Sequence, residues 1–425
     1  MTLGINGHYS VAERQGIFFY GWVIVGLTFV IQFLAMGSTF YIFGVLLKPL
    51  TEALDADRFL VSLGLSSQMV VGALLGPWLG SAVAKYPIRP LMSAGILLLS
   101  LGLFAVSQAT KLWHFYVGFA LIVSVGFALA GPLPNAALVA NWFNRQRGTA
   151  MGISQFGVTF SGVILVPLFT WLMIDFGWRT ALIIFAGGVP LIGLPAIWAG
   201  MVKTPEERNL SPDGDDTGPG PTETEAPSGT HWTLRRALGE KSIRLIAIVM
   251  GSGFITISAV LLSIHSHMTD SGMSDLRASS IIAAMTFTGA LAKPLFGILT
   301  DYLNKKLVTY ISIGAQFSGV AGFVLFDSFG ALIVAAGIFG FGYGAQMPLF
   351  NILVATIYGR RDFPRVIGLM GPIMLPFNML GLPLATLAYE KFGSYLPAYV
   401  GVLAFCLIAA ICLGFLKIQD NDSPL

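Results

Sequence analysis

Long apolar runs, separated by short polar segments, extend along this chain from about residue 20 to residue 416. A helix needs about 20 predominantly apolar residues to cross the hydrocarbon core of a bilayer. The pattern therefore predicts an all-α membrane protein with twelve transmembrane helices. Their expected ranges are 20–47, 61–84, 91–109, 113–142, 148–173, 180–201, 243–268, 278–300, 307–326, 329–357, 364–389 and 394–416.

The composition agrees with the pattern of apolar runs. Hydrophobic residues make up 55% of the chain and charged residues 11%, whereas soluble globular domains carry about 25% charged residues. The 50 Gly and 22 Pro lie mostly inside the apolar runs, where packed transmembrane helices use them. A soluble protein is excluded. The net charge of +3 is spread over loops, so nucleic acid is not an expected partner.

One long polar stretch, residues 202–241, interrupts the apolar runs. Its segment 211–229 is rich in Pro, Gly and acidic residues, a composition that cannot bury a core, so we expect a disordered cytoplasmic linker. The linker separates residues 1–201 from residues 242–425, and each part holds six of the predicted spans. It would act as a slack tether between two bundles.

The distribution of Lys and Arg predicts the orientation. Most of the 24 Lys and Arg fall in loops on the side of the linker, together with both termini, and loops with such an excess face the cytoplasm. We therefore expect a multi-pass protein of the plasma membrane, a bacterial inner membrane, with both termini cytoplasmic.

The two halves resemble each other in sequence. Pro132-Leu133-Pro134-Asn135 is matched 216 positions later by Pro348-Leu349-Phe350-Asn351. A fixed offset indicates an internal repeat. Two parallel six-helix repeats, related by an axis along the membrane normal, bind substrate near the bilayer midplane at the interface of the repeats and rock about it.

Lys293 is the one charged side chain that the pattern places deep inside a span. A cation in hydrocarbon costs several kcal/mol unless it faces water or a partner, so an intramembrane lysine indicates a functional site. The alternative is a lysine that extends to the membrane surface. Asp301, at the helix end, is roughly 12 Å of helix rise away, which is too far. A small organic anion is the expected partner.

Polar residues on the first, fourth, seventh and tenth spans are further candidates for substrate contact. A few polar groups in an otherwise apolar site fix a ligand's orientation, although the same groups also form hydrogen bonds between membrane helices. His265, at the outer end of the seventh span, is either an interfacial side chain or a pH-sensitive gate. The candidate substrate-binding residues are Lys293, Tyr343, Asn351, Asn135, Tyr41, Gln346 and Gln32.

A loop motif follows the eighth predicted span. It consists of Gly297, Asp301, Asn304, Lys305 and Lys306. The motif resembles the loop signature of the major facilitator superfamily, and the resemblance covers nearly the whole chain. It implies the two-bundle fold and a conformational latch in which the acid contacts a neighbouring helix end. The copy in the first half, which begins at Gly80, has Ala84 in place of the acid.

Two further stretches resemble the monocarboxylate transporters and their bacterial relatives of the oxalate/formate antiporter type. One is residues 142–152, which leads into the fifth span and carries Arg145 and Arg147, assigned with the latch. The other is Ala292-Lys293-Pro294 followed by Gly297. The resemblance implies that Lys293 takes the place of the family's substrate-gripping arginine. The family's aspartate, implied in proton coupling, falls at Gly289, and a lysine of the mammalian members falls at Tyr41.

These features together predict a secondary active transporter of a small monocarboxylate, of the lactate, pyruvate, acetate or formate type. A single cation favours a monocarboxylate over a dianion. The mechanism would be proton symport or anion exchange with alternating access, with protons as a coupling ion. We expect a monomer in contact with membrane lipid, with no cofactor, no metal site and no enzymatic activity. An exporter or antiporter of other small molecules or drugs is the alternative, and a non-transporting membrane sensor is a more remote one.

Overall fold

The computed structural model describes residues 19–214 and 232–418, and these residues form helices joined by short loops. Among them are ten helical runs that are long and apolar enough to cross a membrane. Two of these runs are double: Arg147–Gly200 bends at Gly177, and Phe329–Phe392 bends at Gly359. Counted on either side of the bends, the runs contain the twelve expected spans, and the all-α membrane fold is confirmed.

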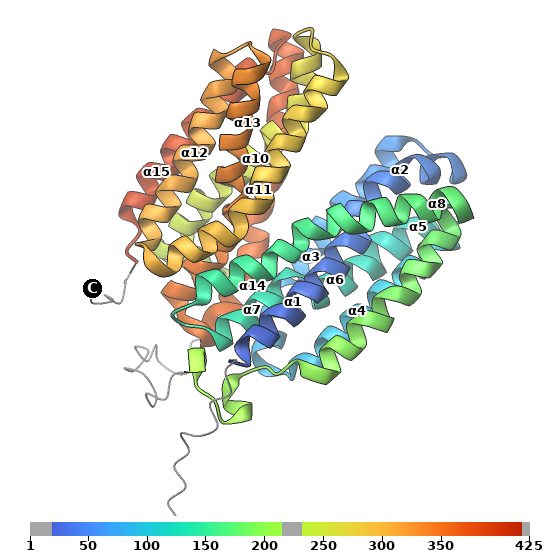
Figure 1. The fold of residues 1–425 in the computed structure, drawn as a ribbon, viewed down its shortest axis with the longest axis vertical. Helices are drawn as coiled ribbons and strands as arrows, with labels where there is room; N and C mark the ends of the chain where they lie inside the picture. The colour runs from blue at the N-terminus through green and yellow to red at the C-terminus, as the bar shows by residue number, and fades with distance from the viewer. Residues whose placement is uncertain (1–18, 215–231, 419–425) are drawn as a thin grey trace, which may run out of the picture.

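The helices form two bundles. Figure 1 shows the first, coloured blue to green, beside the second, coloured yellow to red. The first bundle consists of α1 (Gly21–Met36), η2 (Gly37–Tyr41), α2 (Ile42–Ala53), α3 (Arg58–Lys85), α4 (Ile88–Ser107), α5 (Leu112–Phe115), η3 (Tyr116–Val123), α6 (Ser124–Ala130), α7 (Pro132–Trp142) and α8 (Arg147–Gly200). The second consists of α10 (Lys241–Asp270), α11 (Asp275–Tyr302), α12 (Lys305–Leu325), α13 (Phe329–Gly344), α14 (Gln346–Phe392) and α15 (Leu396–Phe415).

Glycine permits the two sharp bends inside α8 and α14. Gly177 has φ +80° and Gly359 has φ +65°, in the left-handed region where a Cβ is strained. Each bend lets one helical run supply two spans without a loop. The boundary between the two spans is still visible in the sequence, because Asp175 and Arg179 flank the first bend and Arg360 and Arg361 follow the second.

The two bundles touch along two crossings, α8 with α11 and α3 with α14. At both crossings glycines bring the backbones together: Gly148 lies against the carbonyl of Gly297, and Gly80 against the carbonyl of Pro364. Both contacts lie near the end of the molecule that carries residues 201–214, which we call the linker end. Towards the opposite end, the far end, α11 and α8 diverge (Figure 1).

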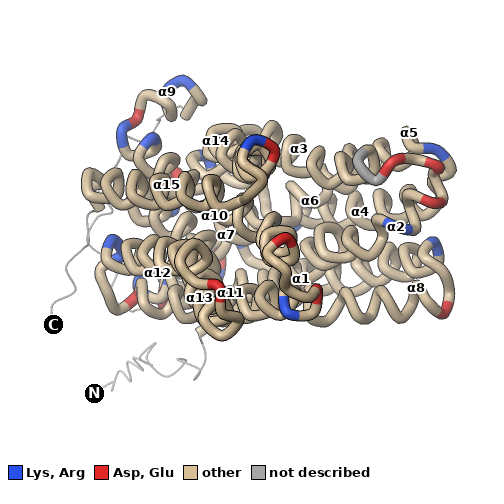
Figure 2. The backbone as a smooth tube through the Cα atoms, turned by 90° about the horizontal axis from the view of Figure 1, so that it is seen from above, with Lys and Arg blue, Asp and Glu red and all other residues tan. Residues whose placement is uncertain are grey.

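Charged residues gather at the helix ends. Figure 2 shows Lys and Arg, and Asp and Glu, at the termini of the helices, with long uncharged stretches between them. This is the distribution expected of a multi-pass membrane protein, since a charge within the hydrocarbon is costly.

The first part of the linker is folded against the first bundle. The carbonyl of Met201 accepts from Arg89 Nε at 2.6 Å, and the carbonyl of Val202 accepts from Trp142 Nε1 at 2.9 Å. Lys203 Nζ donates to the carbonyls of Ala84 and Tyr86, both at 2.9 Å. Two short turns follow, η4 (Pro205–Arg208) and η5 (Pro212–Gly214).

The expectation of a disordered linker over all of 202–241 is therefore wrong for residues 202–214. Composition is a poor guide there, because side chains of the first bundle supply the hydrogen bonds that hold the segment. Residues 232–241 are also described and include α9 (Leu234–Gly239). Residues 215–231, which hold most of the acidic and Pro/Gly-rich sequence, lie outside the described residues.

Candidate functional site

Lys293 joins the two bundles through a hydrogen bond. It lies on α11, and its Nζ donates a hydrogen bond of 2.5 Å to Thr159 Oγ1 on α8. Two turns before Thr159 on α8, the backbones of the two helices cross: a Cβ on Gly152 would lie 2.6 Å from the carbonyl oxygen of Lys293. The bond of Lys293 thus belongs to the contact between α8 and α11, the helices that diverge towards the far end (Figure 1).

Two tyrosines, one from each bundle, lie beside this bond. The ring of Tyr41 packs on Gly162 of α8, where a Cβ would approach it to 2.9 Å. Tyr343 packs on Gly289 of α11, where a Cβ would lie 2.8 Å from its hydroxyl oxygen. Gly162 is about one turn from Thr159, and Gly289 about one turn from Lys293, so each ring packs beside one partner of the bond.

The space at Gly289 bears on the resemblance to monocarboxylate transporters. The tyrosine hydroxyl occupies the volume into which any side chain at position 289 would project. An aspartate at this position, which the resemblance implies for the monocarboxylate transporters, is therefore incompatible with Tyr343 as it lies here. In this chain a phenol, which is neutral at physiological pH, lies where that carboxylate would project.

No carboxylate of the described residues forms an ion pair with Lys293. The Asp and Glu side chains in the described ranges lie at helix ends and in loops, and those that form ion pairs do so with other cations. The ammonium has three N–H donors, and the described hydrogen bond to Thr159 uses one of them. A neutral hydroxyl leaves the positive charge uncompensated, which suits the site to an anion.

The predicted latch residue Asp301 contacts a helix end of the other bundle. Its Oδ1 accepts from the Gly148 N–H and its Oδ2 from the Thr149 N–H, each at 2.7 Å. These N–H groups belong to the first turn of α8, which has no intrahelical acceptor for them and carries partial positive charge. The carboxylate therefore caps α8 from across the interface.

Arg147 is a second predicted latch residue with a hydrogen bond across the interface. Its Nη1 donates to the carbonyl of Ala355 on α14 at 3.1 Å, while its Nε and Nη2 bind Phe143 O and Asn144 Oδ1 in its own bundle. Lys306 instead stays within the second bundle, where its Nζ donates to Gly414 O at 2.7 Å. The remaining predicted latch residues, Gly297, Lys305 and Arg145, lie at the same end of the molecule.

An ion pair that the sequence did not predict also bridges the linker end. Arg360 Nη1, directly after the bend in α14, lies 2.6 Å from Glu206 Oε1 in the linker. Partial burial alone would raise the pKa of Glu206, but its hydrogen bonds and the charge of Arg360 outweigh burial and hold that pKa below its usual range. Asp213, further along the linker, accepts from the Asn144 and Arg145 N–H groups at 2.9 and 2.8 Å.

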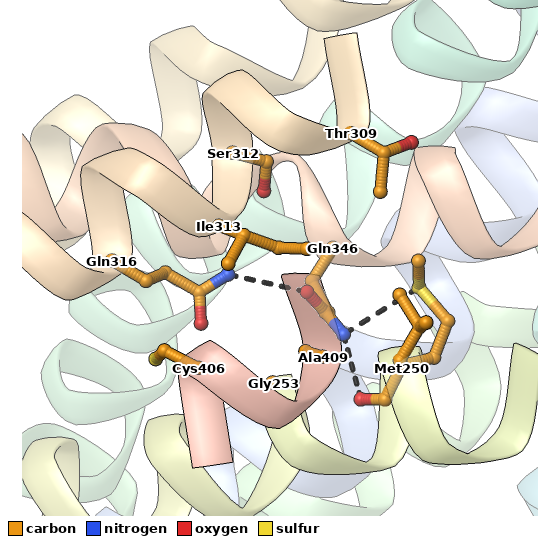
Figure 3. A pocket seen from close by; sticks show the side chains of 10 residues that line it. Met250, Gly253, Thr309, Ser312, Ile313, Gln316, Gln346, Cys406 and Ala409 are labelled. Carbon is orange, nitrogen blue, oxygen red and sulfur yellow. Dashed lines mark hydrogen bonds between the residues drawn. The ribbon is translucent and has the colours of Figure 1, made fainter. Parts of the chain in front are cut away.

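Gln346 lies away from Lys293. Figure 3 shows its side chain at a small cavity inside the second bundle, where its Nε2 donates to Met250 O at 2.7 Å and its Oε1 accepts from Gln316 Nε2 at 3.3 Å. The cavity, about 10 Å³, is lined by residues of α10, α12 and α15 as well. Gln346 thus joins helices of its own bundle.

Gln32 and Asn135 also have bonding partners in their own bundle. Gln32 Nε2 donates to Ser154 Oγ at 2.7 Å, which ties α1 to α8. Asn135 is fully buried, and its Nδ2 donates to the carbonyls of Ala130 and Gly131, both at 2.7 Å. The chain leaves the helical conformation at Gly131, between α6 and α7, so the Ala130 carbonyl at the end of α6 lacks an intrahelical donor, and the asparagine amide supplies one.

The two other predicted residues lie elsewhere in the second bundle. Asn351 is buried on α14, with 5% of its surface exposed. His265 lies towards the far end, with its Nε2 3.9 Å from Asp275 Oδ1 on the next helix of the same bundle.

Thr159 is the site residue that sequence reasoning missed. The candidates were sought on the first, fourth, seventh and tenth spans, whereas Thr159 lies on the fifth. A signal was present: Thr159 is a polar residue three positions before Gly162 in an apolar run, and the same helix crosses the one that carries Lys293.

The sequence profile of the Major Facilitator Superfamily matches residues 28–326 and 244–424, and the chain belongs to this family of membrane transporters. It is a multi-pass transporter and not an enzyme. Among solved structures it resembles the proton:xylose symporter XylE bound to 6-bromo-6-deoxy-D-glucose, with a TM-score of 0.75 and 12% identity over 94% of this chain and 96% of that one. The human organic anion transporter MFSD10 gives a TM-score of 0.69 and 13% identity over 92% and 99%.

Within the family, the chain resembles monocarboxylate transporters. It is 25% identical to monocarboxylate transporter 13 of Rattus norvegicus over 91% of this chain and 87% of that protein. It is 27% identical to monocarboxylate transporter 11 of Mus musculus over 91% and 85%, and 23% identical to monocarboxylate transporter 2 of Homo sapiens over 93% and 84%. The predicted resemblance to this group is confirmed.

Proposed function

We propose that this transporter carries a small monocarboxylate, with Lys293 as the group that binds the carboxylate. The observation that carries the proposal is the hydrogen bond of the Lys293 ammonium to a neutral threonine of the opposite bundle. An ammonium without a carboxylate partner in a low-dielectric setting attracts an anion strongly. The names of the relatives, monocarboxylate transporters, support the same substrate class.

The neighbouring tyrosines complete the proposed site. Tyr41 and Tyr343 lie on opposite bundles beside Lys293 and are neutral hydroxyl donors, so they would bind the carboxylate oxygens or a substituent of the substrate. The single cation favours one negative charge on the substrate over two, as in lactate, pyruvate, acetate or formate. A dianion would leave one charge without a partner.

Alternating access follows from the interface contacts. With the linker end placed in the cytoplasm, as the excess of Lys and Arg there favours, the contacts of Asp301, Arg147 and Glu206 close the cytoplasmic side. The molecule is then in its outward-facing state. Binding at Lys293 would precede closure at the far end and release of the contacts at the linker end. Transport would be coupled as proton symport or as anion exchange.

The test is uptake of labelled lactate, formate and oxalate into proteoliposomes, with and without a pH gradient. Wild-type protein should take up a monocarboxylate, and Lys293→Gln should abolish uptake while it elutes as a folded monodisperse protein. Lys48→Gln, at the exposed end of α2, is the matched control for loss of one positive charge. Normal uptake by Lys293→Gln would refute the role of Lys293 in binding the carboxylate. Uptake of oxalate alone would refute the proposal that the substrate is a monocarboxylate.

A further inference from the structure

The hydrogen bond between Lys293 and Thr159 has a fixed direction. Thr159 Oγ1 accepts from Lys293 Nζ, because an ammonium can only donate. A threonine hydroxyl has one proton and two acceptor lone pairs, so it can hold the ammonium and remain neutral. Thr159 therefore fixes one N–H of Lys293 from the opposite bundle.

We propose that Thr159 is a positioning residue of the substrate site, which sets the place of the Lys293 ammonium. Only one N–H of Lys293 is used in the bond to Thr159, so the ammonium retains further N–H donors for an anion. This inference rests on the proposed function in naming the anion as a monocarboxylate.

The surrounding backbone fixes Thr159 in this role. Gly162, one turn along α8, lies against the Tyr41 ring, and Gly152, two turns earlier, lies against the Lys293 backbone. Thr159 is thus on the stretch of α8 that runs between these two contacts. Valine has the same shape and no hydroxyl, so Thr159→Val removes the hydrogen bond to Lys293 with little change in packing. Serine keeps the hydroxyl.

Uptake kinetics distinguish this role from a structural one. Thr159→Val should raise the KM for the labelled monocarboxylate about tenfold, the loss expected for a hydrogen bond to a charged group, with Vmax within twofold of wild type. Thr159→Ser should stay within twofold of wild type in both. Thr170→Val is the matched control, since the Thr170 hydroxyl bonds only Val166 O of its own helix in the structure. An unchanged KM for Thr159→Val, a change in Vmax alone, or failure of Thr159→Ser to restore KM would each overturn the proposal.

A second measurement does not depend on transport. Thermal unfolding in detergent is compared for wild type, Thr159→Val, Lys293→Met and the double variant. If Thr159 holds Lys293, the two single effects should not add, and additive effects would overturn the inference. If wild type carries no monocarboxylate but the effects are non-additive, the proposed function fails while the positioning of Lys293 by Thr159 stands.

Discussion

Glu206 Oε1 and Arg360 Nη1 lie 2.6 Å apart, so an ion pair joins the linker to the second bundle. Since the preceding residues 201–203 are bonded to the first bundle, this pair connects the bundles through the linker. The linker segment 202–214 is therefore one of the contacts that close the linker end, together with Asp301 and Arg147. A linker without such contacts would not hold the two bundles together at this end.

Loss of this ion pair should favour opening of the linker end. In Glu206→Gln the charge is removed at nearly constant size. The Glu206 side chain is 50% exposed and that of Arg360 26%, and exposed ion pairs contribute about 0–1 kcal/mol. The closed-to-open ratio, which compares molecules closed at the linker end with molecules open there, should therefore fall by up to about fivefold. Distances between spin labels at positions 85 and 361, in a background without Cys406 and Cys412, measure the change.

The pH dependence of this ion pair follows from the lowered pKa of Glu206. A carboxylate whose pKa is lowered in the folded state contributes fully above its unfolded pKa, about 4.3, and the contribution is lost as the pH falls through the folded value. The spin-label distances should thus not respond to this pair between pH 7.5 and 5.5.

The control for Glu206→Gln is Glu207→Gln, which removes the same charge from the adjacent residue. Equal effects of the two variants would exclude a specific role for Glu206.

Asp301→Asn should open the linker end more strongly. The amide cannot accept from both the Gly148 and Thr149 N–H groups, and one of its sides presents an N–H donor to them. Hydrogen bonds to a charged group contribute about 1.5–3 kcal/mol, so the closed-to-open ratio should fall at least tenfold. The same spin-label pair reports it, and Asp57→Asn at the far end is the control. An unchanged distance distribution would show that Asp301 does not hold the bundles together.

The fold was predictable because the bilayer imposes a length on apolar runs that the sequence displays directly. The bends at Gly177 and Gly359 did not obscure it, since charged residues flank the first and follow the second. The linker was misjudged over 202–214 because its order depends on Trp142, Arg89 and other residues distant in sequence, and local composition carries no record of such partners.

The site was predictable only in part. Lys293 is conspicuous because it is a charge in an apolar run, and Asp301 because it belongs to a loop motif. Amide side chains gave no comparable guide: Gln32, Asn135 and Gln346 are polar residues on the expected helices, yet each bonds within its own bundle. Which way a helix face points depends on how the helices rotate and bend, as at Gly131 between α6 and α7, and periodicity does not determine this in a helix that is apolar on all sides.

Gly80→Ala should impair transport because the backbones of α3 and α14 touch at this position. A Cβ there would collide with the carbonyl of Pro364 and lie 3.2 Å from the Cα of Arg365, and neither backbone atom can move without shifting α14. The bundles could then not close at the linker end. Initial uptake should fall at least tenfold, and the spin-label distance should lengthen. Gly72→Ala on the same helix, where a Cβ meets nothing within 4 Å, should behave as wild type. Equal activity of the two variants would contradict the close approach of α3 and α14.

Gly289→Ala should weaken substrate binding by displacing Tyr343. The new Cβ would lie 2.8 Å from the Tyr343 hydroxyl and ring, so the ring must move away from Lys293, and the KM for the monocarboxylate should rise about tenfold, the effect of one lost hydrogen bond to a charged group. Gly314→Ala, at an open position of α12, is the control.

The double variant Gly289→Ala/Tyr343→Phe separates displacement of Tyr343 from an independent effect at position 289. If the glycine acts by leaving room for the tyrosine, the double variant should have the KM of Gly289→Ala, because the displaced hydroxyl no longer contributes. Gly289→Asp, which places a carboxylate at this position, should be inactive for the same steric reason. Full activity of Gly289→Asp would show that Tyr343 leaves this position readily and that the glycine is not needed to make room for it.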